Sequence, residues 1–283
     1  MHYWQLLRPQ QWIKNAFVWA GFLFARAWHD QALAQQVALA FIAFCLLASA
    51  VYIGNDWIDR EADRAHPTKR GRPLASGRIG GAAAASLAIV LTVAGLAIGA
   101  WVGVALFAVL VAYLALNLLY SLLLKRIVIV DVFALSLGFL LRILAGTLGV
   151  GIAPSPWLLM CGLMLTLLLG FGKRRAETAV AGAPGREVLA EYSAALLDRL
   201  IVVCVSGTLI AYSLYTISPQ TIALHGSADL VYTVPIVTYA LFRYLYLLGD
   251  GHAAEDPSGL FVGDRHLQAS AFAWLVAVVW ILR

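Results

Sequence analysis

Nine long apolar segments run through this 283-residue chain and restrict what it can fold into. They cover approximately residues 12–29, 35–54, 82–100, 102–121, 127–150, 156–172, 199–218, 230–248 and 267–282. Most have the length of about 17–25 residues that an α-helix needs to cross a bilayer. Only 12% of the residues are charged, whereas soluble domains carry about 25%. The sequence therefore predicts an all-α, polytopic membrane protein, with residues 1–283 forming a single integral-membrane domain built as a nine-helix transmembrane bundle.

Positive charge lies on one side of the predicted bundle. Arg26 is the only Lys or Arg near the loops that follow the first, third, fifth and seventh segments, while the N-terminus and the other loops carry nearly all the rest. Cytoplasmic loops of membrane proteins are enriched in Lys and Arg. We therefore expect a cytoplasmic N-terminus and a C-terminus outside. No cleavable signal peptide is visible.

Acidic residues are concentrated directly after the second apolar segment. Four of the fifteen Asp and Glu residues lie between Asp56 and Asp63. On a helix, Asp56, Asp59 and Asp63 would share one face, with Asp63 a further turn towards the loop. Like charges this close favour a bound cation, and hard oxygen ligands suit Mg²⁺ held jointly by protein and a polyphosphate. The alternative is a solvated loop of mixed charge at the membrane surface.

Two long loops, residues 55–81 and 173–198, are predicted to be cytoplasmic active-site loops that face one cavity. Each follows an equivalent pair of apolar segments, which suggests a pseudo-repeat. Both carry clustered cations, at Lys69, Arg70, Arg72 and Arg78 in the first and at Lys173, Arg174 and Arg175 in the second. These cations could bind a substrate phosphate, although for the second loop a simple topology anchor is an alternative.

Lysine is used sparingly, which draws attention to its positions. The chain has sixteen arginines but only four lysines, each at or near a predicted cytoplasmic helix end: Lys14, Lys69, Lys125 and Lys173. A compact ammonium group could be required at these places, although four residues are few enough for chance to explain the pattern.

One arginine lies deep in the fifth apolar segment. Arg142 follows Asp131 by eleven residues, a distance of about 16 Å along a helix. An ionisable residue at such depth is costly and normally faces a partner or a polar cavity. Two interpretations stay open, a structural contact within the bundle and a contact with an anionic ligand.

Other signatures are absent from the sequence. It contains no phosphate-binding Gly-Lys-Ser/Thr loop, dinucleotide fingerprint or nucleophile elbow, and its histidines have no metal-ligand spacing. Cys45, Cys161 and Cys204 lie in apolar segments and are expected to be inert. We expect no nucleic-acid partner.

The pattern Asn55-Asp56-x-x-Asp59-x-x-x-Asp63 resembles the first aspartate-rich motif of the UbiA superfamily of intramembrane prenyltransferases. Further motifs resemble the decaprenyl-phosphate phosphoribosyltransferase branch of that superfamily. They are Arg8-Pro9 with Trp12-Ile13-Lys14-Asn15, Tyr120-Ser121 with Lys125 and Asp131, Gly138-Phe139 with Arg142 and Gly146, and Gly172-Lys173-Arg174-Arg175-Ala176-Glu177. The resemblance spans residues 8–265.

This resemblance implies a helical bundle in a bacterial inner membrane, with an active-site cavity open to the cytoplasm. It implies transfer of 5-phosphoribose from phosphoribosyl pyrophosphate to a polyprenyl phosphate, with Mg²⁺ as cofactor. The catalytic carboxylates would be Asp56, Asp59 and Asp63, joined by Asn55 as a metal ligand. The substrate-binding residues would be Lys14, Lys69, Arg72, Tyr120, Lys125, Arg142, Lys173, Arg174 and Glu177. A homo-oligomer is compatible with this interpretation.

One departure from the wider superfamily bears on the substrate. Aromatic prenyltransferases of this superfamily carry a second Asp-x-x-x-Asp motif after the sixth span, but here that loop has Asp198 as its only aspartate and opens with three cations. A basic second loop fits a donor with a pyrophosphate and a separate phosphate. The alternatives are prenyl transfer from an isoprenyl diphosphate to a lipid-soluble acceptor and, less in keeping with the charge on the rim, a transporter.

Overall fold

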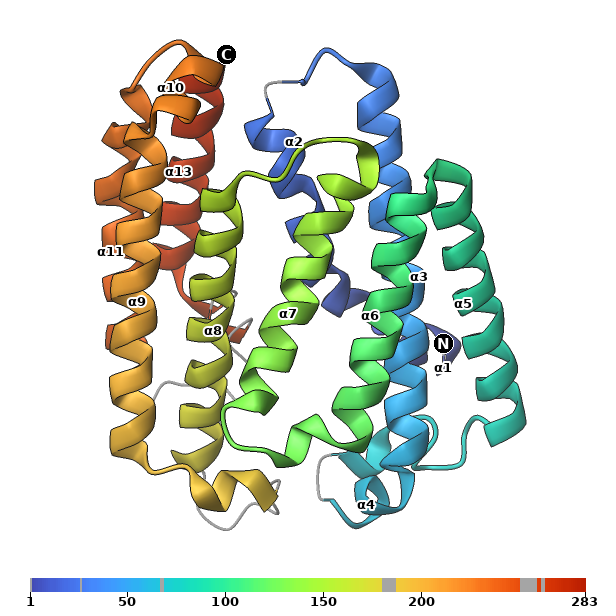
Figure 1. Ribbon diagram of the computed structural model, residues 1–283. Helices are drawn as coiled ribbons and strands as arrows, with labels where there is room; N and C mark the ends of the chain where they lie inside the picture. The colour runs from blue at the N-terminus through green and yellow to red at the C-terminus, as the bar shows by residue number, and fades with distance from the viewer. Residues whose placement is uncertain (1, 26, 67–68, 180–186, 250–258, 261–262) are drawn as a thin grey trace. The chain divides into compact units, whose positions relative to one another are not determined.

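The computed structural model describes residues 2–25, 27–66, 69–179, 187–249, 259–260 and 263–283, and within these ranges the chain is helical and has no strand (Figure 1). The helices of the first half are α1 (His2–Leu7), the 3-10 helix η1 (Pro9–Trp19), α2 (Ala20–Phe24), α3 (Gln31–Ile58), α4 (Arg60–Ala65), η2 (Lys69–Gly71), α5 (Gly81–Val102), α6 (Val104–Leu122) and η3 (Leu124–Arg126). Those of the second half are α7 (Val130–Ala145), η4 (Leu148–Val150), α8 (Pro156–Ala179), η5 (Glu187–Glu191), α9 (Ala194–Ile217), α10 (Pro219–His225), η6 (Asp229–Thr233), α11 (Val234–Gly249) and α13 (Arg265–Leu282).

Eight helical stretches of the described residues are long and apolar enough to cross a membrane, and they match eight of the nine predicted segments. They are Gln31–Ile58, Gly81–Val102, Val104–Leu122, Val130–Val150, Pro156–Thr178, Ala194–Ile217, Asp229–Gly249 and Arg265–Leu282. The prediction of an all-α, multi-pass membrane protein is confirmed, and the count of nine is approximate.

The first predicted segment, residues 12–29, does not form one long α-helix. Arg8 has a left-handed backbone, Pro9 begins η1, and only after Trp19 does the short α2 follow. Proline restricts the residue before it to conformations outside the right-handed helix, which explains the break between α1 and η1. At about 2.0 Å per residue for η1 and 1.5 Å for α2, the two helices together extend about 30 Å.

The chain divides into two compact units. Unit 1 comprises Met1–Leu23, Ala27–Leu123 and Gly138–Pro154, and unit 2 comprises Phe24–Arg26, Leu124–Leu137 and Ser155–Arg283. The interpretation of the chain as a single membrane domain stays a prediction.

In unit 1, α3 packs along α5 and also contacts η1 and α6. Residues such as Val18, Phe44 and Leu110 form one apolar core, and a second cluster around Leu6 and Ile53 lies under the loop that precedes α5. Gly146 permits close packing against η1, because a Cβ atom at this position would lie 1.6 Å from the carbonyl oxygen of Val18.

In unit 2, α8 packs along α9, and α11 packs against α13. The core of this unit includes Phe171 from α8, Leu197 and Ile201 from α9, and Tyr244 from α11. Tyr192, just before α9, also belongs to this core. Each unit thus has its own buried apolar interior.

Candidate active site

The acidic motif lies in unit 1, where α3 ends and α4 begins. Asp59 is the residue between the two helices, and its N–H donates to the carbonyl oxygen of Asn55. The helix is interrupted there, yet Asp56 and Asp63 are both buried. Asp59 is half-buried.

Arg72 joins the two buried carboxylates. Its Nη1 atom lies 3.1 Å from Oδ1 of Asp56 and 2.7 Å from Oδ2 of Asp63. Asp56 and Asp63 thus approach one guanidinium, but from two successive helices rather than from one face of a continuous helix. Asp63 was expected to lie further out towards the loop, but the turn at Asp59 brings it as close to Arg72 as Asp56 is.

Arg8 is a second partner of Asp56, and it was not among the predicted site residues although the Arg8-Pro9 motif was noted. Its Nη2 atom lies 2.5 Å from Oδ1 of Asp56, and its guanidinium carbon lies 5.3 Å from the centre of the Tyr52 ring. Arg8 adopts φ 51° and ψ 57°, a left-handed conformation that is unfavourable for residues with a Cβ atom. In the sequence, the Arg8-Pro9 dipeptide was the signal for this residue. Strained residues of this kind are found preferentially at functional sites.

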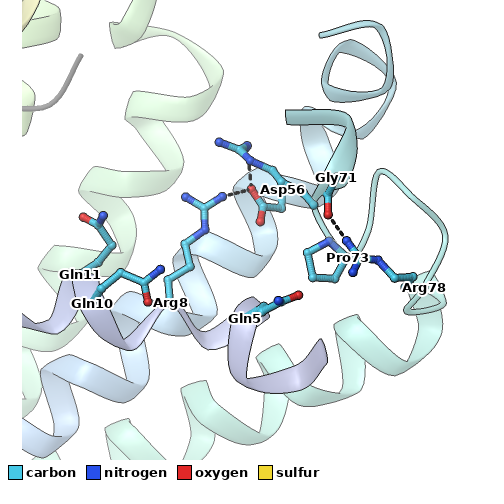
Figure 2. A pocket seen from close by; sticks show the side chains of 9 residues that line it. Gln5, Arg8, Gln10, Gln11, Asp56, Gly71, Pro73 and Arg78 are labelled. Carbon is cyan, nitrogen blue, oxygen red and sulfur yellow. Dashed lines mark hydrogen bonds and ion pairs between the residues drawn. The ribbon is translucent and has the colours of Figure 1, made fainter. Parts of the chain in front are cut away.

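A polar pocket of about 390 Å³ opens over these residues (Figure 2). The residues that line it come from α1, η1, the end of α3 and the loop before α5: Gln5, Arg8, Gln10, Gln11, Asp56, Gly71, Arg72, Pro73 and Arg78. Arg78 is held in place because it donates to the carbonyl oxygen of Gly71. Three arginines and three glutamine amides around one carboxylate are suited to binding an anion.

The fourth acid of the motif points elsewhere. Glu61 is exposed and accepts hydrogen bonds from Arg60 and Arg64. Its pKa is lowered, first by the hydrogen bond from Arg60 and then by the charge of Arg64. Glu61 thus belongs to a surface ion-pair group.

The oxygen atoms of this motif fit a Mg²⁺ site completed by a substrate. No three His, Cys, Asp or Glu side chains come together as a ligand set in the part of the chain that the structure describes. Asp56 and Asp63 nevertheless converge on one positive group, the Nη1 atom of Arg72. Mg²⁺ commonly takes only one or two carboxylates and completes its coordination with water and phosphate oxygens. The amide oxygen of Asn55, which accepts from Ser121 at 2.8 Å, is a further hard ligand of the same motif.

Unit 2 contains a second cluster of charged residues, in which Arg174 and Asp131 are buried and Glu177 is partly exposed. Nε of Arg174 lies 2.7 Å from Oδ2 of Asp131, and Nη1 of Arg174 lies 2.5 Å from Oε2 of Glu177. The side chains of Asp131 and Arg174 are both 0% exposed. Tyr192 donates to the other oxygen of Asp131 at 2.7 Å.

This geometry differs from the prediction that Arg174 faces a substrate phosphate. Its guanidinium is fully enclosed and two of its N–H groups are used by Asp131 and Glu177. The neighbouring Lys173 is half-buried. The sequence pattern of three adjacent cations could not distinguish between these roles, because the partner Asp131 is 43 residues away in the chain.

Arg142 lies in unit 1 and is buried among neutral groups. It donates to Asn15 Oδ1 at 2.7 Å, to the carbonyl oxygen of Gly138 at 2.8 Å and to the Tyr113 hydroxyl at 3.1 Å. Its guanidinium carbon also lies 5.0 Å from the centres of the Tyr113 and Phe139 rings. These contacts join α7 to η1 and α6, and they favour the structural interpretation of this residue.

The other predicted substrate-binding residues are half-buried and lie at helix ends or in 3-10 helices: Lys14 in η1, Lys69 in η2, Tyr120 near the end of α6 and Lys125 in η3. Of the two loops predicted to form the site, residues 67–68 and 180–186 lie outside the described residues.

Comparisons with known proteins identify the family of this chain. Residues 15–276 match the UbiA prenyltransferase family. Decaprenyl-phosphate phosphoribosyltransferases of Mycolicibacterium smegmatis, Corynebacterium glutamicum and Mycobacterium tuberculosis are each 36% identical to this chain. The matches cover 95%, 96% and 96% of this chain and 88%, 84% and 91% of those proteins, respectively.

Solved structures show the same fold. A UbiA homologue from Archaeoglobus fulgidus bound to GPP and Mg²⁺ aligns with a TM-score of 0.74 at 16% identity, covering 100% of this chain and 99% of that one. A structure of digeranylgeranylglyceryl phosphate synthase aligns with a TM-score of 0.66 at 17% identity, covering 99% and 94%. By sequence and by fold, this chain belongs to the UbiA prenyltransferase family.

Proposed function

We propose that this protein is a membrane transferase that moves 5-phosphoribose from phosphoribosyl pyrophosphate to a polyprenyl phosphate and releases pyrophosphate. The observation that carries the proposal is the 36% identity, over nearly the whole chain, to proteins named decaprenyl-phosphate phosphoribosyltransferase. The pocket of arginines and glutamines over Asp56 supports it, because its charge suits a phosphorylated donor.

The acidic motif would hold the cofactor. Asp56, Asp59, Asp63 and Asn55 supply hard oxygen atoms of the kind that Mg²⁺ prefers. When bound, Mg²⁺ supplies positive charge that stabilises a pyrophosphate leaving group. Solved UbiA homologues with bound Mg²⁺ are consistent with the use of this ion.

The protein's own cations would position the donor. Arg8 and Arg72 are partly exposed and, together with Arg78, line the pocket. Arginine presents a planar fork of N–H groups that binds phosphate oxygens in pairs. The acceptor is already an anion, so the reaction requires no protein nucleophile. Catalysis then depends mainly on positioning and electrostatic stabilisation.

The lysines have proposed roles at the two substrates. Lys173, with Lys69 and Lys125, would bind donor phosphate, while Lys14 would meet the headgroup of the lipid phosphate. Tyr120, which directly precedes the Asn55 partner Ser121, would contribute a hydroxyl. In the structure Arg174, Glu177 and Arg142 are held in protein contacts, and we assign them to supporting these groups.

The orientation in the membrane completes the proposal. The N-terminus and the loops with the acidic and basic motifs would be cytoplasmic, where a soluble phosphorylated sugar is available, and the C-terminus would be outside. The membrane would be a bacterial inner membrane. The one-sided distribution of Lys and Arg supports this orientation.

Prenyl transfer is the second candidate function, because structural relatives were solved with the prenyl diphosphates GPP and DMAPP. An experiment with two parallel arms distinguishes phosphoribosyl transfer from prenyl transfer. Purified protein in lipid nanodiscs with Mg²⁺ receives ribose-labelled phosphoribosyl pyrophosphate and polyprenyl phosphate in one arm, and labelled isoprenyl diphosphate with an aromatic acceptor in the other. We expect label in the organic phase from the sugar donor and none in a new product from the isoprenyl diphosphate. The reverse pattern would reject the proposed function.

A further inference from the structure

The phenol of Tyr192 connects three separate parts of unit 2. Its hydroxyl accepts a hydrogen bond from the N–H of Ile129 at 2.6 Å and donates one to Oδ1 of Asp131 at 2.7 Å. The second oxygen of Asp131 binds Nε of Arg174 on α8. One tyrosine thus fastens the segment before α9 to the start of α7 and, through Asp131, to the end of α8.

The residue that Tyr192 holds has a strained backbone. Ile129 has φ 69°, a left-handed conformation that is a marked outlier for a β-branched residue. Such a conformation persists only where the surroundings enforce it, and it is found mainly at functional sites. The hydrogen bond from the N–H of Ile129 to the hydroxyl of Tyr192 helps to hold this backbone conformation.

The three side chains of this network are also buried. Asp131 and Arg174 are 0% exposed and Tyr192 is 5% exposed. Burial raises the pKa of the Tyr192 phenol above its ordinary value, and the hydrogen bond to Asp131 adds to the shift. The phenol therefore keeps its proton over the whole working pH range. Polar groups enclosed in this way are costly to leave unpaired, so the arrangement specifies one geometry.

We propose that Tyr192 is a positioning residue of the transferase, which holds Asp131 and Arg174 in register and thereby fixes Lys173 for the phosphate of the donor. This inference rests on the proposed function, since it assigns Lys173 to the donor. Lys173 directly precedes Arg174 on α8, so a rotation of this helix end would redirect its ammonium group. Tyr192 itself contacts no substrate.

The test uses Tyr192→Phe, which keeps the ring in the apolar core and removes only the hydroxyl. The matched control is Tyr212→Phe in the same unit, because the buried hydroxyl of Tyr212 also makes two hydrogen bonds, with Thr233 at 2.6 Å and Trp274 at 2.8 Å. We expect Tyr192→Phe to raise the KM for phosphoribosyl pyrophosphate about 10-fold, the size of effect typical of a lost hydrogen bond to a charged group. The KM for polyprenyl phosphate should stay unchanged, and kcat should change by less than about 2-fold. The control should leave both constants unchanged.

Hydrogen exchange provides a readout that does not depend on turnover. Without substrates, the amide of Ile129 should exchange faster in Tyr192→Phe than in the wild type and in Tyr212→Phe. Equal exchange rates of the Ile129 amide in the three proteins would contradict the claim that Tyr192 holds this part of the backbone. A donor KM that is unchanged in Tyr192→Phe but raised in Lys173→Ala would overturn the positioning role and leave the proposed function intact. Absence of phosphoribosyl transfer by the wild type would instead reject the proposed function and, with it, the role of Lys173.

Discussion

Among the described residues, each compact unit contains an arginine bound by two carboxylates, but these two arginines differ in their access to solvent. In unit 1, Arg72 binds Asp56 and Asp63, is 29% exposed and lines a pocket. In unit 2, Arg174 binds Asp131 and Glu177 and is 0% exposed. The same local chemistry thus occurs once at a pocket wall and once in a closed interior.

Burial decides what each cluster can do. An arginine at a pocket wall can turn an N–H group towards a substrate phosphate, because its guanidinium is itself partly exposed to water. An arginine in a closed interior cannot, because its release would leave a buried charge without compensation. We therefore expect the loss of a charge from the first cluster to affect catalysis and the loss of a charge from the second to affect stability.

The largest expected effect is on stability, from Arg174→Met. This substitution roughly preserves the volume but leaves Asp131 as an unpaired buried charge, and we expect a loss of about 3–5 kcal/mol in the free energy of unfolding. Arg175→Met is the matched control, because the pair of Arg175 with Asp198 is partly exposed and exposed pairs contribute less than about 1 kcal/mol. Denaturant titration in detergent micelles measures both. Similar losses in the two variants would contradict the claim that burial decides how much the loss of an arginine costs.

Asp56→Asn should affect turnover instead. We expect kcat to fall by about 10²–10³-fold, the effect of removing one charged group that stabilises a transition state, with little change in the unfolding midpoint. Asp59→Asn should behave in the same way. The matched control is Asp30→Asn, which makes the same change at the other end of α3, where Asp30 caps the helix by accepting from the N–H of Leu33. Full activity in Asp56→Asn, or in excess chelator, would exclude the metal site.

Lys173→Ala should have a smaller and more selective effect. We expect the KM for phosphoribosyl pyrophosphate to rise about 10-fold, as for the loss of one charge-assisted contact, with little change in the KM for the lipid. Lys173→Arg keeps the charge and should recover part of the loss. An unchanged KM for phosphoribosyl pyrophosphate would indicate that the cations of loop 173–198 serve only to orient the protein in the membrane.

The smallest expected effect concerns Asp264. Its ion pair with Arg243 is partly exposed, so it can be compared with the buried pair of Arg174 and Asp131 in the same unit. The hydrogen bond from Arg243 lowers the pKa of Asp264 to about 2. A lowered carboxyl pKa gives stability that is complete above the unfolded-state pKa of about 3.9 and disappears as the pH falls towards 2. The difference in melting temperature between wild type and Asp264→Asn should thus be constant from pH 5 to 8 and shrink below pH 4. A difference that varies between pH 5 and 8 would contradict this assignment.

Much of the fold and part of the site could be predicted from local patterns. Apolar length located eight membrane-crossing helices, and helical spacing grouped Asp56 with Asp63, although they approach Arg72 from two successive helices. The 3-10 geometry of η1 could not be predicted, because apolar composition does not distinguish it from an α-helix. Contacts over long sequence separations were also invisible, such as those of Arg8 with Asp56 and of Tyr192 with Asp131. These depend on packing rather than on spacing.

The central claim is that the bond from ribose to pyrophosphate breaks and the 5-phosphate stays with the sugar. Two preparations of phosphoribosyl pyrophosphate, one with ³²P in the 5-phosphate and one with ³²P in the β-phosphate, test it directly with polyprenyl phosphate, Mg²⁺ and the wild-type protein. We predict that the 5-phosphate label enters the lipid phase, that the β-phosphate label appears as soluble pyrophosphate in equal amount, and that Asp56→Asn slows the release of both by the same factor of about 10²–10³. Lipid-phase label from the β-phosphate, or no transfer of the 5-phosphate label, would contradict the account.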